Sequence, residues 1–201
     1  MATTYYHILG HGNAPSSATP HHRTEKLRAL VPQGTTVKEI RYDCRLPVAE
    51  QLGQVASQLN PYDPNSNDVL VGHSLGALYA LVMEQHARIR RLILLNPSLI
   101  PHVTLRDQLS SVDEMRRVTR DQLSDWHAIY TDIVYSRTSA LTGVAVLCDG
   151  DEKLRLHYPM FCAMLAKRGM SVQFASGGTH STIPDSALVN AIHRELMTTV
   201  N

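Results

Sequence analysis

The sequence has few cysteines, no long apolar run and no excess of charge of either sign. Three widely spaced cysteines, Cys44, Cys148 and Cys162, form neither a disulfide framework nor a CxxC metal pair. No apolar run approaches the roughly 18 residues that a membrane span requires. Lys and Arg number 19 against 18 Asp and Glu, which argues against a dedicated nucleic-acid-binding protein. The N-terminus lacks a basic region before an apolar stretch, so we expect no secretory signal and a cytoplasmic location.

The 201 residues suffice for one globular domain with a sizeable core, and we expect a single domain over residues 1–201. Six short runs have the apolar or alternating pattern of β-strands: Tyr5–Leu9, Thr36–Tyr42, Asp68–Val71, Arg91–Leu95, Gly143–Cys148 and Ser171–Ala175. Runs with helical periodicity separate most of them, and Thr24 is the expected N-cap of the first helix. This alternation predicts the α/β class, with a mostly parallel sheet covered by helices on both faces.

The segment from residue 101 to 142 interrupts this alternation. It contains no recognisable strand, and Leu123, Trp126, Tyr130 and Ile133 recur in it at helical spacing. We expect a helical excursion between two strands of the sheet. It either covers an edge of the sheet or forms a small lid over a pocket, since long insertions in compact domains are often functional.

The most informative motif is Gly72-His73-Ser74-Leu75-Gly76, which fits G-x-S-x-G. It follows a buried strand and precedes a helix, and this context predicts a nucleophilic serine on a tight turn. Glycines two positions either side of Ser74 leave room for that turn. The N-terminus of the following helix supplies unpaired N–H groups and the positive end of its dipole.

A serine hydroxyl needs a base and an orienting acid to attack a carbonyl at neutral pH. Candidates for both follow later strands of the predicted sheet. Asp149, Asp151 and Glu152 come directly after the run Gly143–Cys148, and His180 follows the last run. The chain order Ser, Asp, His is that of the α/β-hydrolase fold. His180 is therefore the candidate base, and the pattern alone leaves Asp149 and Asp151 open as the acid.

Taken together, these motifs resemble the α/β-hydrolase superfamily over nearly the whole chain. The sequence is most similar to the small bacterial YqiA-type esterase family. The matching residues are His11, Gly12, Asn13, Pro15 and Ser16 in an early loop, then Ser74, Asn96, Pro97, Gly150, Asp151, Glu152, Gly177, Gly178 and His180. The chain departs from the family in the early loop, where Asn13 follows His-Gly in place of an aromatic residue.

The resemblance implies roles for further residues. It aligns Asp151 with the family acid and favours it over Asp149. It implies an oxyanion hole formed by the backbone N–H groups of Leu75, the residue after the nucleophile, and Asn13. His11, Gly12 and His73 are neighbours of this machinery and possible substrate-binding residues.

Eleven histidines raise the question of a metal site. The adjacent pair His21-His22 is the most suggestive, but adjacent residues seldom converge on one metal. No His, Asp or Glu at helical spacing supports the pair. We therefore expect no metal and no cofactor.

The prediction is a compact α/β-hydrolase with a small helical lid that cleaves carboxylic esters through an acyl-enzyme. Its expected partner is a small-molecule ester or thioester. Thioester, amide or lactone cleavage on the same triad is the nearest alternative, because nothing in the sequence distinguishes leaving groups. A non-catalytic binding protein that keeps the fold is the other alternative. The sequence leaves the oligomeric state open.

Overall fold

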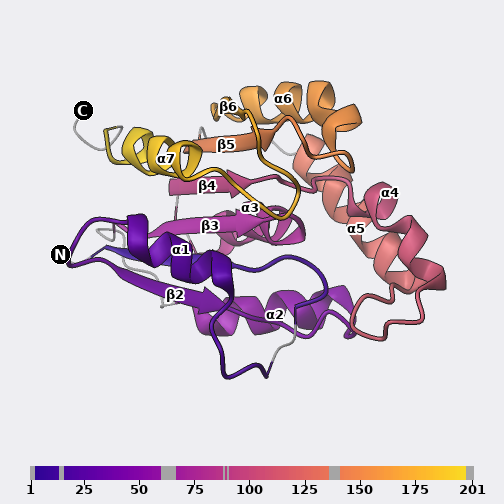
Figure 1. The fold of residues 1–201 in the computed structure, drawn as a ribbon. Helices are drawn as coiled ribbons and strands as arrows, with labels where there is room; N and C mark the ends of the chain where they lie inside the picture. The colour runs from indigo at the N-terminus through magenta and orange to yellow at the C-terminus, as the bar shows by residue number, and fades with distance from the viewer. Residues whose placement is uncertain are drawn as a thin grey trace.

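A computed structural model describes residues 3–13, 16–59, 67–87, 89, 91–135 and 141–197. Within these residues, a parallel β-sheet of six strands forms the centre of the molecule (Figure 1). The strands are β1 (Thr4–Ile8), β2 (Thr36–Ile40), β3 (Val69–His73), β4 (Arg91–Leu95), β5 (Thr142–Cys148) and β6 (Ser171–Ala175). Their order across the sheet is β2-β1-β3-β4-β5-β6. The predicted α/β class and parallel sheet are confirmed.

Helices cover both faces of the sheet. The helices are α1 (His22–Leu30), α2 (Val48–Gln58), α3 (Leu75–Ala87), α4 (Pro101–Thr104), α5 (Arg120–Tyr135), α6 (Tyr158–Lys167) and α7 (Asp185–Met197), with short 3₁₀ turns at Arg106–Ser110 and Arg155–His157. Helices α1 and α7 lie on the face turned toward the viewer in Figure 1, and α2 and α3 lie behind the sheet. No helix in the described ranges is both long and apolar enough to cross a lipid bilayer.

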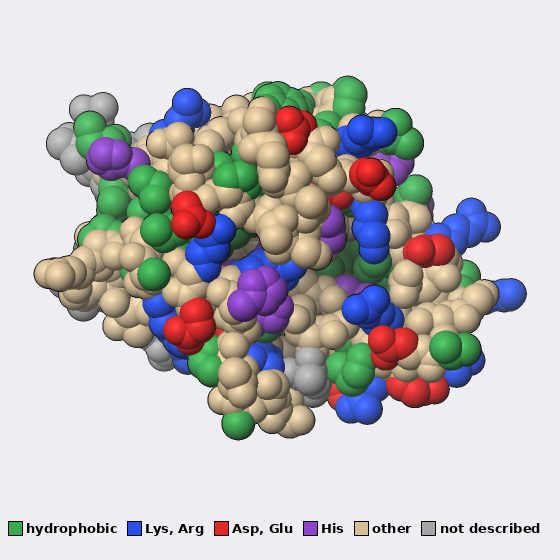
Figure 2. Space-filling view, viewed as in Figure 1, with side chains coloured by type: hydrophobic (Ala, Val, Ile, Leu, Met, Phe, Trp, Pro, Cys, Tyr) green, Lys and Arg blue, Asp and Glu red, His purple; other side chains and the backbone are tan. Residues whose placement is uncertain are grey.

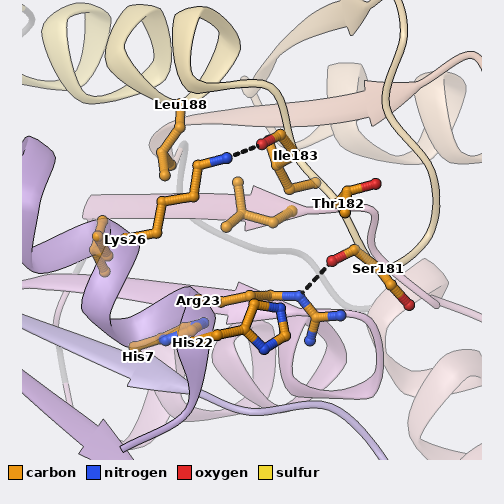
Figure 3. Close-up of a pocket in the computed structure, with 10 residues that line it drawn as sticks. His7, His22, Arg23, Lys26, Ser181, Thr182, Ile183 and Leu188 are labelled. Atoms are coloured by element: carbon orange, nitrogen blue, oxygen red, sulfur yellow. Dashed lines mark hydrogen bonds between the residues drawn. The ribbon is translucent and has the colours of Figure 1, made fainter.

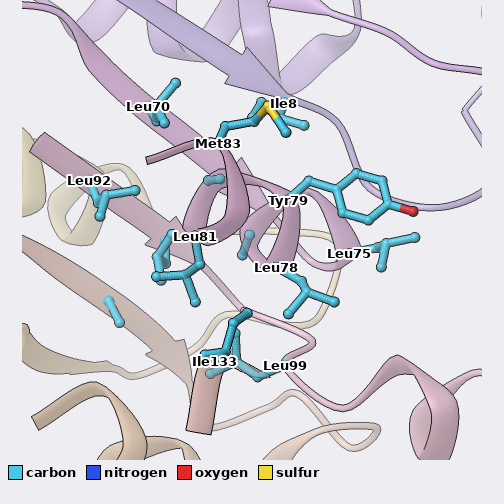
Figure 4. Packing of buried hydrophobic residues seen from close by; sticks show 14 of the residues in the cluster. Ile8, Leu70, Leu75, Leu78, Tyr79, Leu81, Met83, Leu92, Leu99 and Ile133 are labelled. Carbon is cyan, nitrogen blue, oxygen red and sulfur yellow. The ribbon is translucent and has the colours of Figure 1, made fainter. Parts of the chain in front are cut away.

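The alternation of side chains along each strand explains why two cores form. In β3, Val69 and Val71 pack toward α1 and α7, whereas Leu70 packs toward α3. Figure 4 shows the second of these cores, where Leu70 and Leu92 of the sheet meet apolar side chains of α3. Both faces of the central strands are therefore apolar, as expected for a parallel sheet covered on both sides.

The strand order creates a crevice at the carboxyl ends of two neighbouring strands, β1 and β3. The chain leaves β1 toward β2 on one side and continues from β3 to β6 on the other. Ligands of open α/β sheets bind outside the carboxyl ends of the strands, at the point where the order reverses. In this chain that point lies between the ends of β1 and β3, beside the Gly10–Asn13 loop and Ser74.

The described part of the 101–142 segment is largely helical, as the sequence predicts. It contains α4, a 3₁₀ turn and α5, with non-helical backbone over 111–119, and Thr142 begins β5. It lies beyond the carboxyl ends of the strands (Figure 1). Trp126 of α5 is completely buried, and its indole N–H donates to the Tyr79 hydroxyl of α3 at 3.1 Å. Helix α5 is thereby anchored to the body of the molecule. Motion of the segment as a lid, and the single domain over residues 1–201, stay predictions.

The start of the first helix differs from the prediction. Helix α1 begins at His22, and the His21 side chain caps it by accepting from the Arg23 N–H at 3.2 Å. Thr24 lies inside the helix and is buried, with its hydroxyl 2.9 Å from Nδ1 of His7 in β1. The expected capping hydroxyl instead joins α1 to the sheet. Pro15 of the early loop lies outside the described residues.

Candidate active site

Ser74 occupies a strained turn between β3 and α3. Its φ angle of 55° lies in the left-handed region, which non-glycine residues seldom adopt. A Cβ added to Gly72 would lie 2.5 Å from the Cα of Ala77, and one added to Gly76 would lie 2.3 Å from the Ile8 carbonyl oxygen. Both glycines are therefore required by close backbone approach. The turn holds the Ser74 hydroxyl at the carboxyl edge of the sheet.

His180 lies between Ser74 and Asp151. Its Nε2 is 3.0 Å from Ser74 Oγ, and its Nδ1 is 2.8 Å from Asp151 Oδ2. Ser74 is 7% exposed, His180 is partly exposed, and Asp151 is completely buried. Loops after three different strands supply the three groups, so sheet order brings together residues that are far apart in sequence.

Asp149 and Asp151 face different partners. Oδ1 of Asp149 accepts the Gly177 N–H at 3.0 Å, and the residue is exposed. Oδ1 of Asp151 accepts the N–H groups of Lys153 and Leu154, each at 3.2 Å, which leaves Oδ2 for His180. Of the two candidate acids, the structure therefore places only Asp151 at the histidine.

Asn96 joins the loops that carry Asp151 and His180. It follows β4 with a φ angle of 41°, a left-handed conformation that asparagine tolerates better than most residues. Its side-chain amide donates to the Thr179 carbonyl at 2.7 Å, and its Oδ1 accepts the Cys148 N–H at 2.9 Å. Asn96 is completely buried, and its side chain links the end of β5 to the loop that carries His180.

His73, beside Ser74, forms a hydrogen bond to the loop that carries His180. Its Nε2 donates to the His180 carbonyl oxygen at 2.8 Å, and the residue is 3% exposed. Burial, with the nearby Arg23 guanidinium, holds the pKa of His73 well below its usual range. The ring is therefore neutral at neutral pH and acts here as a hydrogen-bond donor.

The two residues expected to form the oxyanion hole lie at the same edge of the sheet. Leu75 is the first residue of α3, where backbone N–H groups lack a partner within the helix. Asn13 follows β1, and its side chain donates to the Gly10 carbonyl at 2.7 Å, which closes a compact loop. Asn13 and Ser74 line the same cleft.

His11 and Gly12 tie this loop to the helical excursion. Nε2 of His11 donates to the Arg116 carbonyl at 2.9 Å, and its ring stands edge-on to Trp126. Burial lowers the pKa of His11. Gly12 has a φ angle of 81°, and an added Cβ would lie 3.2 Å from Cγ of Arg116. Both residues line the cleft, and the hydrogen bond of His11 is made to the protein itself. Their part in substrate binding stays a prediction.

An open cleft of about 300 Å³ leads to Ser74. Polar and basic side chains dominate its lining, and Leu105 is its one aliphatic side chain among the described residues. A smaller cavity of about 60 Å³ lies beside it between α1, α7 and the histidine loop (Figure 3). Arg23 and Ser181 line both spaces.

In the described part of the chain, no three His, Cys, Asp or Glu side chains are grouped to hold a metal ion. The rings of His21 and His22 are 4.3 Å apart. His21 accepts the Arg23 N–H, and burial together with Arg23 lowers the pKa of His21 to about 4.

The motifs missed two residues of this region, Arg23 and Lys153, and named Asn96 without assigning it a role. Asn96 belongs to the family pattern, and a polar residue directly after a buried strand was the signal for its position at the site. Arg23 and Lys153 carry no local signal, because a basic residue in a helix or a turn is ordinarily solvated. Only the fold brings them to the cleft.

The strand order and the residues gathered at the carboxyl edge of the sheet define the α/β-hydrolase fold. The chain belongs to a family described as an uncharacterised protein family (UPF0227), whose model matches residues 7–141. This confirms the resemblance to the YqiA-type group. The match includes Ser74 but ends before Asp151 and His180. No curated protein matches the sequence significantly.

Solved structures with similar folds include several esterases. Est1E from Butyrivibrio proteoclasticus superimposes with a TM-score of 0.69 at 17% identity, over 98% of this chain and 89% of Est1E. An esterase from the archaeon Pyrobaculum calidifontis gives 0.66 at 16% identity, over 100% of this chain and 76% of its own. XC6422 from Xanthomonas campestris, described as a serine hydrolase without a lid, gives 0.58 at 17% identity, over 97% and 82%. At these identities the likeness shows the fold.

Proposed function

We propose that this protein is a serine hydrolase that cleaves carboxylic esters through an acyl-enzyme intermediate. The observation that carries the proposal is the continuous hydrogen-bonded series from Ser74 Oγ through the His180 imidazole to the buried Asp151 carboxylate. The strained φ angle of Ser74 supports it, because such strain concentrates at functional sites. The similarity of its fold to that of known esterases also supports the proposal.

In the acylation step, His180 Nε2 takes the Ser74 proton as Oγ attacks the ester carbonyl carbon. Asp151 holds the imidazole with Nε2 facing the serine and stabilises the imidazolium that forms. The negative oxygen of the tetrahedral intermediate accepts hydrogen bonds from the N–H groups of Leu75 and Asn13. The imidazolium then protonates the leaving alcohol, and the acyl group remains on Ser74.

Deacylation repeats the same chemistry with water. His180 takes a proton from the water as it attacks the acyl carbonyl. The second intermediate then collapses, the imidazolium returns the proton to Ser74 Oγ, and the carboxylic acid is released. All of these steps use the chain's own side chains and backbone N–H groups.

The test combines turnover with covalent labelling of the purified protein. We expect hydrolysis of p-nitrophenyl butyrate and labelling of Ser74 by a fluorophosphonate probe, located by mass spectrometry. Ser74→Ala removes the attacking atom, and the loss of kcat/KM should be at least ~10³-fold, since serine hydrolases lose up to about 10⁶-fold. Ser57→Ala, on the exposed surface of α2, is the matched control and should keep both signals.

Two results would overturn the proposal. Retention of activity by the Ser74→Ala variant would exclude this nucleophile. A folded wild-type protein that neither turns over esters nor reacts with the probe would favour a binding protein. Butyryl-CoA is assayed in parallel, and a large preference for it would move the substrate class from esters to thioesters.

A further inference from the structure

The cleft that leads to Ser74 is lined by positive charge. Its described lining contains the cationic side chains of Arg23, Arg116 and Lys153 and no Asp or Glu. Figure 2 shows blue Lys and Arg side chains and purple His side chains bordering the hollow to the right of the centre. The nearby carboxylate of Asp151 is completely buried and is bonded to His180. The molecule as a whole carries a net charge of only +1, so the positive charge is local.

Arg23 is the most unusual of these cations. Its guanidinium is half-buried, with Nε donating to the Ser181 carbonyl at 2.9 Å, as Figure 3 shows. Among the ion pairs of the described residues, none includes Arg23. Burial lowers its pKa to about 10, which leaves it charged at neutral pH. A half-buried charge without a counter-ion is costly, and a bound anion would compensate that cost.

Lys153 and Arg116 contribute to the positive charge of the cleft to different extents. Lys153 follows the Asp151 turn, is exposed at the cleft, and takes part in no ion pair of the described residues. Arg116 lies 3.4 Å from the Asp113 carboxylate, which offsets part of its charge. Arg23 and Lys153 are therefore the two cations without a carboxylate partner.

We propose that the substrate of this site is an anionic ester, with a carboxylate or phosphate group held by Arg23 and Lys153 while its carbonyl lies at Ser74. The planar guanidinium of arginine suits both anions, because it donates two parallel hydrogen bonds to either. The single aliphatic side chain of the described lining agrees with a short polar substrate rather than a long acyl chain. This inference rests on the proposed ester hydrolysis and names the substrate class.

Matched ester pairs test the inference. The first pair is p-nitrophenyl hemisuccinate and p-nitrophenyl butyrate, which share a four-carbon acyl chain and differ in a carboxylate. The second is 4-butyryloxyphenyl phosphate and phenyl butyrate, which places a phosphate on the leaving group. The quantity measured is the charged-to-neutral ratio of kcat/KM, after subtraction of the uncatalysed rates. We expect a ratio of about tenfold in at least one pair at low salt, decreasing in 0.5 M NaCl.

Variants connect the preference to the cleft. Arg23→Gln should bring the ratio close to one, and Lys153→Gln, at an exposed side chain, should lower it without a risk to folding. Arg28→Gln is the matched control, because it removes the same charge from the exposed surface of α1 and should leave the ratio unchanged. Normalising to the neutral ester separates a loss of anion binding from a general loss of activity, which would reduce both rates equally.

The outcomes separate the two proposals. A preference in only one pair supports the inference and identifies the anion as carboxylate or phosphate. Ratios near one in both pairs, with the neutral esters hydrolysed, would overturn the inference and leave the esterase standing. A preference that survives in both the Arg23→Gln and Lys153→Gln variants would also overturn it. Absence of all hydrolysis and of Ser74 labelling would instead contradict the proposed function.

Discussion

At the scale of single residues, the environment of a carboxylate determines what it can do. Asp151 is buried, with one oxygen held by two backbone N–H groups and the other against His180. Asp149, two positions earlier, is exposed and accepts from a backbone N–H of the neighbouring loop. Only a carboxylate in the first environment can fix the tautomer and orientation of the imidazole.

Replacement of the two aspartates by asparagine should therefore have very different effects. Asp151→Asn keeps the shape but favours the wrong imidazole tautomer, and we expect kcat for p-nitrophenyl butyrate to fall by about 10⁴-fold. Asp149→Asn retains an acceptor for the Gly177 N–H and should change kcat by less than about threefold. Steady-state kinetics of both variants check this. Equal losses of kcat in the two variants would contradict the assignment of Asp151 as the acid.

Asn96 illustrates how a neighbour with no chemical step of its own can support the proposed catalytic groups. Its amide spans the Thr179 carbonyl and the Cys148 N–H, one on each of the loops that carry the histidine and the acid. Such contacts hold catalytic side chains in productive geometry, where displacements of about 1 Å cost large factors in rate.

At the scale of secondary structure, the serine turn depends on the close approach of α3 to β1. A Cβ on Gly76 would lie 2.3 Å from the carbonyl oxygen of Ile8, the last residue of β1, and 2.5 Å from that of Leu9. The helix can therefore begin directly after Ser74 only when position 76 has no side chain. The spacing of the G-x-S-x-G motif follows from this packing.

Two glycine-to-alanine variants test this explanation. Gly76→Ala should destabilise the protein by about 1–3 kcal/mol or prevent folding, because the backbone must move away from β1. Gly53→Ala is the control in the exposed middle of α2, where an added Cβ meets nothing within 4 Å. Alanine favours helix there, so a gain of up to about 1 kcal/mol is expected. Urea unfolding midpoints measure both, and an unchanged midpoint for Gly76→Ala contradicts the packing argument.

The helical excursion is another element whose anchoring bears on function. Gln122 of α5 donates to the Cys44 and Leu46 carbonyls, and Trp126 donates to Tyr79. These buried contacts fasten α5 to the rest of the molecule. If the excursion moves over the cleft, we therefore expect the motion in α4 and the following 3₁₀ turn, near the cleft residue Leu105.

At the scale of the whole molecule, buried neutral histidines make stability depend on pH. Burial lowers the pKa of His7 to about 3, and the residue is 1% exposed. His73 shifts in the same direction. In the unfolded chain these groups take up protons near pH 6.5, so the unfolded state binds more protons between that pH and the folded pKa. Stability is therefore fully present above about pH 6.5 and is lost as the pH falls toward 3.

The free energy of unfolding should accordingly fall between pH 6.5 and 5, where carboxylates remain ionised, by up to about 1.4 kcal/mol per pH unit for each such histidine. His7→Asn removes one titrating group and should make this slope shallower, whatever it does to the absolute stability. Ser57→Ala, at an exposed position of α2, removes no titrating group and should leave the slope unchanged. Urea titrations across this pH range measure the slopes, and identical slopes for His7→Asn and the wild type would refute the assignment.

The sequence by itself determined the features that depend on neighbouring residues. Apolar runs predicted the strands, and the glycines around Ser74 predicted the turn, because the steric demands of both arise within a few positions along the chain. The order of Ser74, Asp151 and His180 likewise followed from motifs that each end a strand.

Only the tertiary structure decided which distant groups meet. The separation of Asp149 from Asp151 depends on how one turn packs against the histidine loop, and the position of Arg23 depends on where α1 crosses the sheet. Thr24 departed from its expected capping role because the buried ring of His7 offered its hydroxyl a partner across the α1–sheet interface. Contacts of this kind arise from the path of the whole chain, so no local pattern predicts them.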